Sequence, residues 1–340
     1  MDVCFSFRRM VVRKLIYHRG KIFGIVDIHF GKRDTFSQMV NIGKLIGRIN
    51  RGMLTEKVFN IICPIIEKDM MTIKNNVIDY AILGSSSGHY GWKEVRFCDF
   101  DIWIFCNNIS DIGMISGIRN LIEDIKAVVK NENIILLADA INGPYKPEIW
   151  RIDSKDILFL HLLIDDSQSY NERSIFTKLS WSKYEAYYNK YLLKTLLDRM
   201  PTEYDLLHSK CGILRTLDSL HCGVIKYNQI NLSTGLQLIV EFNRESTQYI
   251  EFILHSVMMI SRNRARLSKQ KEADCLENTG FAEWYEKMYG DSFVRFIAEY
   301  KAKVSDYGYG VIESITVLEK MTICWLIKLR DELEEIYEKK

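Results

Sequence analysis

Two aspartates separated by one residue give this chain its clearest chemical signal. Asp99 and Asp101 lie in the run RFCDFDIWIFC (residues 96–106), which is otherwise rich in residues that favour a buried strand. Side chains alternate along a strand, so both carboxylates are expected on the same face of a sheet. Two neighbouring acids in apolar surroundings need a positive partner, and a divalent cation that prefers oxygen ligands meets that need. Ion pairs with a nearby Lys or Arg are the structural alternative.

A turn rich in glycine and serine precedes this strand. The apolar run VIDYAIL (residues 77–83) predicts a buried strand, and it stops at the sequence GSSSG. Small residues let backbone N–H groups approach a phosphate closely, and serine hydroxyls can donate to it. Gly84, Ser85 and Ser86 are therefore candidate phosphate-binding residues. A strand, a Gly-Ser turn and Asp-x-Asp on the next strand outline a site for a metal ion and a triphosphate, which is what phosphoryl or nucleotidyl transfer requires.

The string LGSSSGHYGWKEVRFCDFDIWIF (residues 83–105) resembles the signature of the DNA polymerase β-like nucleotidyltransferase superfamily. The predicted elements that follow are similar in order to those of antibiotic nucleotidyltransferases and cyclic-oligonucleotide synthases, and the resemblance covers roughly residues 55–166. It implies that Gly84 and Ser85 bind nucleotide phosphates. It also implies that Asp99 and Asp101 hold Mg²⁺, with an NTP as co-substrate.

The resemblance implies a third carboxylate on a later strand, and here the sequence departs from the family pattern. In the run DILFLHLLIDD (residues 156–166) the expected acidic position falls near Leu160 or His161. His161 is a candidate catalytic residue, as a weaker ligand for Mg²⁺ or as a proton acceptor. A core histidine bonded to a neighbour is the structural alternative. Asp156 or Asp165 is a further candidate, reaching in from a strand end.

Hydrophobic periodicity predicts the elements that position these residues. Strands are expected over residues 10–17, 22–30, 77–83, 96–106, 133–138 and 157–164. A helical pattern runs from about residue 38 to residue 74, with Thr55 as the expected cap of its second helix, and another helix is expected to begin at Ser110 or Asp111.

The polar segment DDSQSYNERS (residues 165–174) marks the expected domain boundary. Residues 1–170 are expected to form the nucleotidyltransferase catalytic domain with an N-terminal basic hairpin, and residues 171–340 an all-α helical bundle. Helices of the second domain are expected over residues 181–199, 203–222, 233–242, 246–267, 281–304 and 311–338. The predicted fold class is therefore α+β, with a mixed sheet flanked by helices ahead of the bundle.

Composition limits the alternatives. The chain has 340 residues, of which 47% are hydrophobic and 26% charged, a profile that argues against disorder. The net charge of +2 excludes a binder driven by overall charge, although residues 1–57 carry a local +8. Eight cysteines without a Cys-x-x-Cys pair exclude a zinc framework. No apolar stretch is long enough to span a membrane, so a soluble, cytoplasmic protein without a membrane partner is expected.

The sequence thus predicts Mg²⁺-dependent transfer of a nucleoside monophosphate from an NTP to a hydroxyl of a small-molecule acceptor, with release of pyrophosphate. RNA or an oligonucleotide is the alternative acceptor or product, with the basic residues 1–57 as its contact, and a catalytically impaired binding module is another alternative. Arg215 and His221 also have the Arg-x5-His spacing of HEPN-type ribonucleases. An Arg215 that faces the cleft or pairs with an acid is the simpler interpretation.

Overall fold

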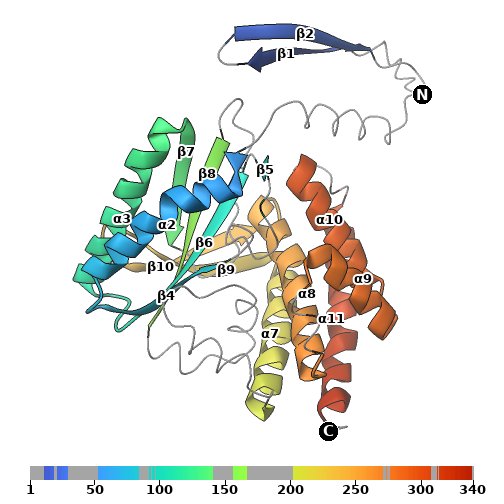
Figure 1. Cartoon of the computed structure of the whole chain (residues 1–340). Helices are drawn as coiled ribbons and strands as arrows, with labels where there is room; N and C mark the ends of the chain where they lie inside the picture. The colour runs from blue at the N-terminus through green and yellow to red at the C-terminus, as the bar shows by residue number, and fades with distance from the viewer. Residues whose placement is uncertain are drawn as a thin grey trace. The chain divides into compact units, whose positions relative to one another are not determined.

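The computed structural model defines the chain in blocks (Figure 1). The structure describes residues 11–18, 21–29, 53–83, 92, 94–95, 97–140, 156–166, 202–270, 273, 276–307, 312 and 314–338. The chain divides into two compact units, Met1–Gly52 and Met53–Lys340. Most of the expected boundary segment and the helix expected over residues 181–199 lie outside the described residues, so both stay predictions.

The first unit contains an antiparallel hairpin. Strands β1 (Val11–His18) and β2 (Lys21–His29) pair along their whole length, with His18 opposite Lys21. The hairpin predicted from the two Val- and Ile-rich runs is confirmed.

A four-stranded mixed sheet in the second unit contains the two aspartates. Its strands lie in the order β4-β6-β8-β7, with β4 antiparallel to β6 and the other three parallel. The strands are β4 (Val77–Leu83), β6 (Phe97–Cys106), β7 (Ile134–Ala140) and β8 (Asp156–Asp166). The predicted mixed sheet and the coarse α+β class are therefore confirmed.

Two helices, α2 (Thr55–Thr72) and α3 (Ile112–Asn131), cover one face of this sheet (Figure 1). Asp111 caps α3, because its Oδ1 accepts a hydrogen bond from the backbone N of Met114 at 2.8 Å. The cap expected for α2 is wrong. The short strand β3 (Met53–Leu54) pairs with β5 (Glu94–Val95) and runs directly into the helix, so Leu54 takes the N-cap position and Thr55 is already helical.

The two faces of the sheet have different roles. The even-numbered residues of β6 and β8 pack with α2 and α3 into one apolar core: Cys98, Phe100, Ile102, Ile104, Cys106, Leu158, Leu160, Leu162 and Ile164. The opposite face carries the odd-numbered residues, among them Asp99, Asp101 and His161 beside the buried rings of Trp103 and Phe159. The alternation that builds the core thus gathers the polar residues on the other face.

The remainder of the second unit is mainly helical and has a core of its own. Its helices are α7 (Glu203–Cys222), α8 (Thr247–Leu267), α9 (Asn278–Tyr289), α10 (Phe293–Tyr307) and α11 (Ile315–Glu338). The prediction of one helix over residues 281–304 is wrong, because Gly290 adopts a left-handed conformation (φ 67°) that ends α9.

The expectation of an all-α second half is also wrong. Where a helix was expected over residues 233–242, strands β9 (Val224–Ile230) and β10 (Gln237–Asn243) form an antiparallel hairpin. Ile225 and Tyr227, two residues apart in β9, both pack in the helical core. A two-residue spacing of buried side chains is the period of a strand and not of a helix. Ile230, at the end of the same strand, packs instead in the sheet core, so this hairpin contributes to both cores.

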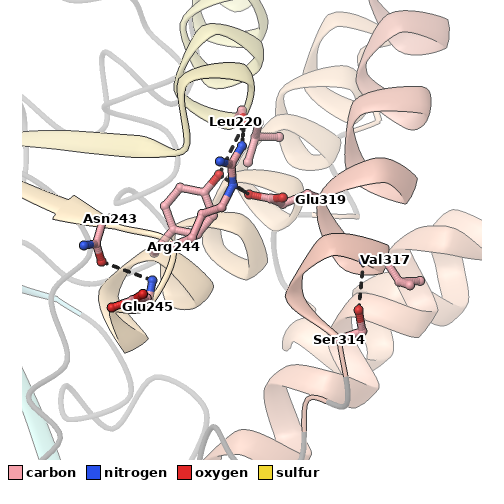
Figure 2. A network of polar contacts seen from close by, with 8 residues as sticks. Leu220, Asn243, Arg244, Glu245, Ser314, Val317 and Glu319 are labelled. Atoms are coloured by element: carbon pink, nitrogen blue, oxygen red, sulfur yellow. Dashed lines mark hydrogen bonds and ion pairs between the residues drawn. The ribbon is translucent and has the colours of Figure 1, made fainter.

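A polar network fixes the hairpin to the helices (Figure 2). Arg244, just after β10, donates from Nε to Glu319 Oε1 of α11 at 2.7 Å and from Nη2 to the carbonyl of Leu220 in α7 at 3.0 Å. The hydroxyl of Tyr249 donates to the same Glu319 oxygen at 2.5 Å. Burial, followed by this bond to Glu319, raises the pKa of Tyr249 well above its usual range, so the phenol stays protonated as a donor.

The described cysteines are all free thiols, which agrees with the absence of a disulfide pattern in the sequence: Cys63, Cys98, Cys106, Cys211, Cys222 and Cys324. None of the helices in the described part of the chain combines the length and the apolar character needed to cross a membrane.

Candidate metal centre

Strand pairing brings three of the predicted site residues together. Asp101 of β6 pairs in register with His161 of β8, and Asp99 pairs with Phe159. Paired positions on neighbouring strands lie on the same face of a sheet. His161 therefore occupies a place directly beside Asp-x-Asp, where the family resemblance implies a third acid.

The distances within this group suit a shared cation. Asp99, Asp101 and His161 each offer one atom that could bind a metal, and these three atoms lie within 4.8 Å of one another. His161 Nδ1 is 3.0 Å from Asp101 Oδ1. The His161 side chain is only 7% exposed, whereas that of Asp101 is 23% exposed, so solvent reaches the group from the Asp101 side.

An aromatic ring supports the imidazole. The ring of Phe159 lies 5.6 Å from that of His161, with an angle of 20° between their planes. This stacking and the contact with Asp101 orient the imidazole. We call the aligned positions Leu83, Asp101 and His161 across β4, β6 and β8 the row. The arrangement offers two kinds of chemistry, namely coordination of a divalent cation by two carboxylates and a nitrogen, or proton acceptance by an imidazole that Asp101 orients.

The strand ends do not supply the third acid. Asp165 pairs with Phe105, four residues along the strands from the Asp101–His161 pair, which corresponds to about 13 Å at the rise of a strand. Asp156 is five residues before His161, so its position falls on the opposite face of the sheet. Of the candidates named from the sequence, His161 alone shares the row with Asp101.

The strand that precedes the Gly-Ser segment ends next to Asp101. Leu83, the last residue of β4, pairs in register with Asp101. Gly84, Ser85 and Ser86 themselves lie outside the described residues, and their predicted role in phosphate binding stays a prediction.

One acidic position in this row was not singled out from the sequence. Asp139 of β7 pairs in register with His161, on the side of β8 away from Asp101. The backbone thus places an aspartate position on each side of His161. The run IILLADA contains the acid, but only the register between β7 and β8 relates it to the site.

Arg215 and His221 are both exposed residues of α7. A step of six residues turns a helix so that the two positions lie about 120° apart around its axis. The two residues therefore do not share one face of α7, and the spacing alone does not form a paired site.

A separate cavity of about 340 Å³ lies between the start of α3 and the β9–β10 turn. Its lining residues are Ser110, Ile112, Ile115, Arg119, Thr234, Gly235, Leu236 and Gln237. It includes none of the residues predicted to do chemistry. Ile112, the first residue of α3, is 82% exposed here.

No protein-family model, no curated protein and no solved structure matches this chain. The function of the site is therefore argued from its own geometry.

Proposed function

We propose that this protein is a nucleotidyltransferase that depends on a divalent cation. It transfers a nucleoside monophosphate from an NTP to a hydroxyl of a small-molecule acceptor and releases pyrophosphate. The observation that carries the proposal is the row formed by Leu83, Asp101 and His161 across β4, β6 and β8. This row brings the last residue of β4, which precedes the Gly-Ser segment in the sequence, next to the Asp-x-Asp pair and a third polar side chain.

The electrostatics of the row support binding of a cation. Asp99 and Asp101 bring two carboxylates to one face, and His161 adds a nitrogen at 3.0 Å from Asp101. A cation that also binds triphosphate oxygens would balance both the acids and the nucleotide. Such a cation neutralises charge on the phosphates when it is bound, which is its contribution to nucleotidyl transfer.

The residues of the chain then have distinct tasks. Asp99 and Asp101 hold the cation, and Gly84, Ser85 and Ser86 bind the phosphates of the NTP. The oxygen of the acceptor forms a bond with the α-phosphorus as the bond from that phosphorus to the oxygen bridging the α- and β-phosphates breaks. Pyrophosphate leaves with that bridging oxygen. His161 either completes the cation site or takes the proton that the acceptor hydroxyl loses.

The acceptor is proposed to be small because the chain carries little net charge and no nucleic-acid-binding motif. An RNA or oligonucleotide acceptor is the second candidate, and the local charge of +8 over residues 1–57 favours it. The affinities for these two kinds of acceptor should depend differently on salt concentration. Binding through several phosphates weakens steeply as salt rises, whereas a small acceptor with few charges is affected little.

Pyrophosphate release from purified protein tests the proposal directly. The full chain is incubated with each of the four NTPs, a divalent cation and a panel of hydroxyl acceptors. Asp99→Asn and Asp101→Asn should each reduce release by more than about 100-fold, beyond the loss typical of residues that only support metal ligands. Asp331→Asn, at an exposed position of α11, is the matched control and should keep the wild-type rate.

Two results would contradict the proposal. Equal rates for wild type and both site variants would show that the site lies elsewhere. Binding of an NTP, seen as thermal stabilisation, without pyrophosphate release under any condition would instead favour a binding module with the same architecture, which is the alternative suggested by His161 in place of an acid.

A further inference from the structure

We infer that the Asp99–Asp101–His161 site binds Mn²⁺ in preference to Mg²⁺. The inference concerns the cation of the proposed nucleotidyl transfer and rests on that proposal for its biological meaning. It departs from the Mg²⁺ that the sequence resemblance implies. The reason lies in the donor set that the structure brings together.

The first argument is the chemistry of the third ligand. Mg²⁺ binds oxygen ligands almost exclusively and keeps several waters, whereas imidazole nitrogen suits later and softer divalent ions. His161 supplies a nitrogen where an aspartate would supply an anionic oxygen. Mn²⁺ accepts carboxylates, phosphate oxygens and imidazole together, so it fits both this donor set and a triphosphate.

The second argument is geometric. Neighbouring ligands of a six-coordinate ion with bonds of about 2.1 Å lie about 3 Å apart. His161 Nδ1 and Asp101 Oδ1 form a hydrogen-bond contact of 3.0 Å, which is also the spacing of adjacent ligands, so an ion can replace the shared proton without a large movement of either side chain. The stacked ring of Phe159 and the burial of His161 hold the imidazole in this orientation. The nitrogen is therefore placed to bind the ion directly rather than through a water.

The third argument is charge. With a neutral imidazole the three side chains carry two negative charges, whereas three aspartates would carry three. Mg²⁺ gains mainly from charge in exchanging its waters for carboxylates, so the loss of one negative charge weakens Mg²⁺ binding most. Mn²⁺ recovers part of this loss through the bond to nitrogen.

Direct binding measurements test the inference without relying on activity. Mn²⁺ is titrated into the full chain and followed by the EPR signal of free Mn²⁺, and Mg²⁺ affinity is obtained by competition. The ratio of the two dissociation constants, Mg²⁺ over Mn²⁺, should fall on the order of tenfold in His161→Asp. His221→Asp makes the same change at an exposed site on α7, and it should leave the ratio unchanged.

A spectroscopic readout needs no variant and so does not depend on whether His161→Asp folds. Pulsed EPR of the Mn²⁺ complex of the wild-type chain should show the ¹⁴N coupling of a directly bound imidazole. That coupling should disappear in His161→Gln and persist in His221→Asp. Absence of ¹⁴N coupling in the wild type, or the same Mg²⁺ to Mn²⁺ ratio in wild type and His161→Asp, would overturn the inference.

The outcome is separable from the fate of the proposed function. Pyrophosphate release supported by Mg²⁺ as well as by Mn²⁺, without ¹⁴N coupling, would keep the nucleotidyltransferase and refute the preference. Mn²⁺ binding with ¹⁴N coupling but without turnover would keep the preference and refute the activity.

Discussion

The protein places carboxylates in two polar clusters and compensates their charge in two different ways. On the sheet, Asp99 and Asp101 lie together with the imidazole of His161. Among the helices, Glu319 meets the guanidinium of Arg244, which lies 2.7 Å away and also contacts a backbone carbonyl. The second cluster contains a guanidinium, whereas the first combines two acids with an imidazole.

This difference separates a structural cluster from a binding cluster. A carboxylate paired with an arginine of the same chain stabilises the fold, and removing one partner leaves an uncompensated charge. Two acids and an imidazole on one face, in contrast, form a set of ligands that a cation can bind. Substitutions in the helical cluster should therefore change the free energy of unfolding, whereas substitutions on the sheet should mainly change cation binding.

The largest effect on stability is expected for Arg244→Met. The Glu319 side chain is only 7% exposed, so it would keep a nearly buried negative charge without its guanidinium. The free energy of unfolding in urea should fall by clearly more than it does in Arg330→Met, and Mn²⁺ affinity should not change. Arg330→Met, which removes an arginine from an exposed pair with Asp331, should cost less than about 1 kcal/mol. Equal losses for the two variants would mean that Glu319 is not compensated by Arg244.

Two glycines in the same backbone conformation make the comparison sharper. Gly223 and Gly290 both adopt a left-handed conformation at the end of a helix, with φ of 68° and 67°. A Cβ at Gly223 would come within 2.4 Å of Arg244 Cζ, whereas one at Gly290 would meet open space. Gly290→Ala should cost about 1 kcal/mol from backbone strain alone, and Gly223→Ala about 2 kcal/mol because the guanidinium must also move. Urea unfolding of both variants measures the two losses of unfolding free energy. Equal losses would show that the Arg244 side chain can move away from the new methyl group without cost.

A smaller effect is expected at the sheet. Without a divalent cation, Asp101→Asn should change the free energy of unfolding by less than about 1 kcal/mol, because the relief of repulsion between two neighbouring negative charges opposes the weakening of the contact with His161. With Mn²⁺ at ten times its dissociation constant the wild type should gain about 1.4 kcal/mol, and the variant nothing. Thermal unfolding with and without Mn²⁺ measures both quantities. A loss of clearly more than about 1 kcal/mol in the absence of the ion would show that the role of Asp101 is mainly structural.

The smallest effect is expected for Tyr227→Phe. Its hydroxyl is buried and has no hydrogen-bond partner among the described residues, and burial raises its pKa well above the usual range. Removing the hydroxyl should change the free energy of unfolding by less than about 0.5 kcal/mol or stabilise the protein, because no bond is lost. Tyr249→Phe is the matched control and should cost about 2 kcal/mol, since that hydroxyl donates to Glu319. A similar cost at Tyr227 would reveal a partner such as a buried water.

Local patterns in the sequence predicted most elements. The run VIDYAIL gave β4 its observed bounds, and the periodicity over residues 203–222 gave those of α7. The segment that forms β10 was misassigned as a helix, because a short apolar run does not distinguish the two states and its pairing with β9 decides between them. Single residues decided the other differences, such as the break that Gly290 makes between α9 and α10.

The candidate site was predictable only in part, for a similar reason. Asp99 and Asp101 belong to one strand, so the sequence alone predicts that their side chains lie on the same face, because side chains alternate along a strand. The neighbours of Asp101 depend on how separate strands align. His161 was named as one of several candidates, and the register singles it out, whereas Asp139 was missed because nothing in its own strand relates it to β6.

The β9–β10 hairpin has a consequence for how the two halves depend on each other. Ile230 and Leu232 come from the second half of the chain, yet they pack with the core beneath the sheet. Without the residues after 202, the apolar side chains of the sheet core that contact Ile230 and Leu232 would be exposed to water. A chain cleaved between residues 166 and 202 should remain a non-covalent complex, and separated fragments should recombine when mixed.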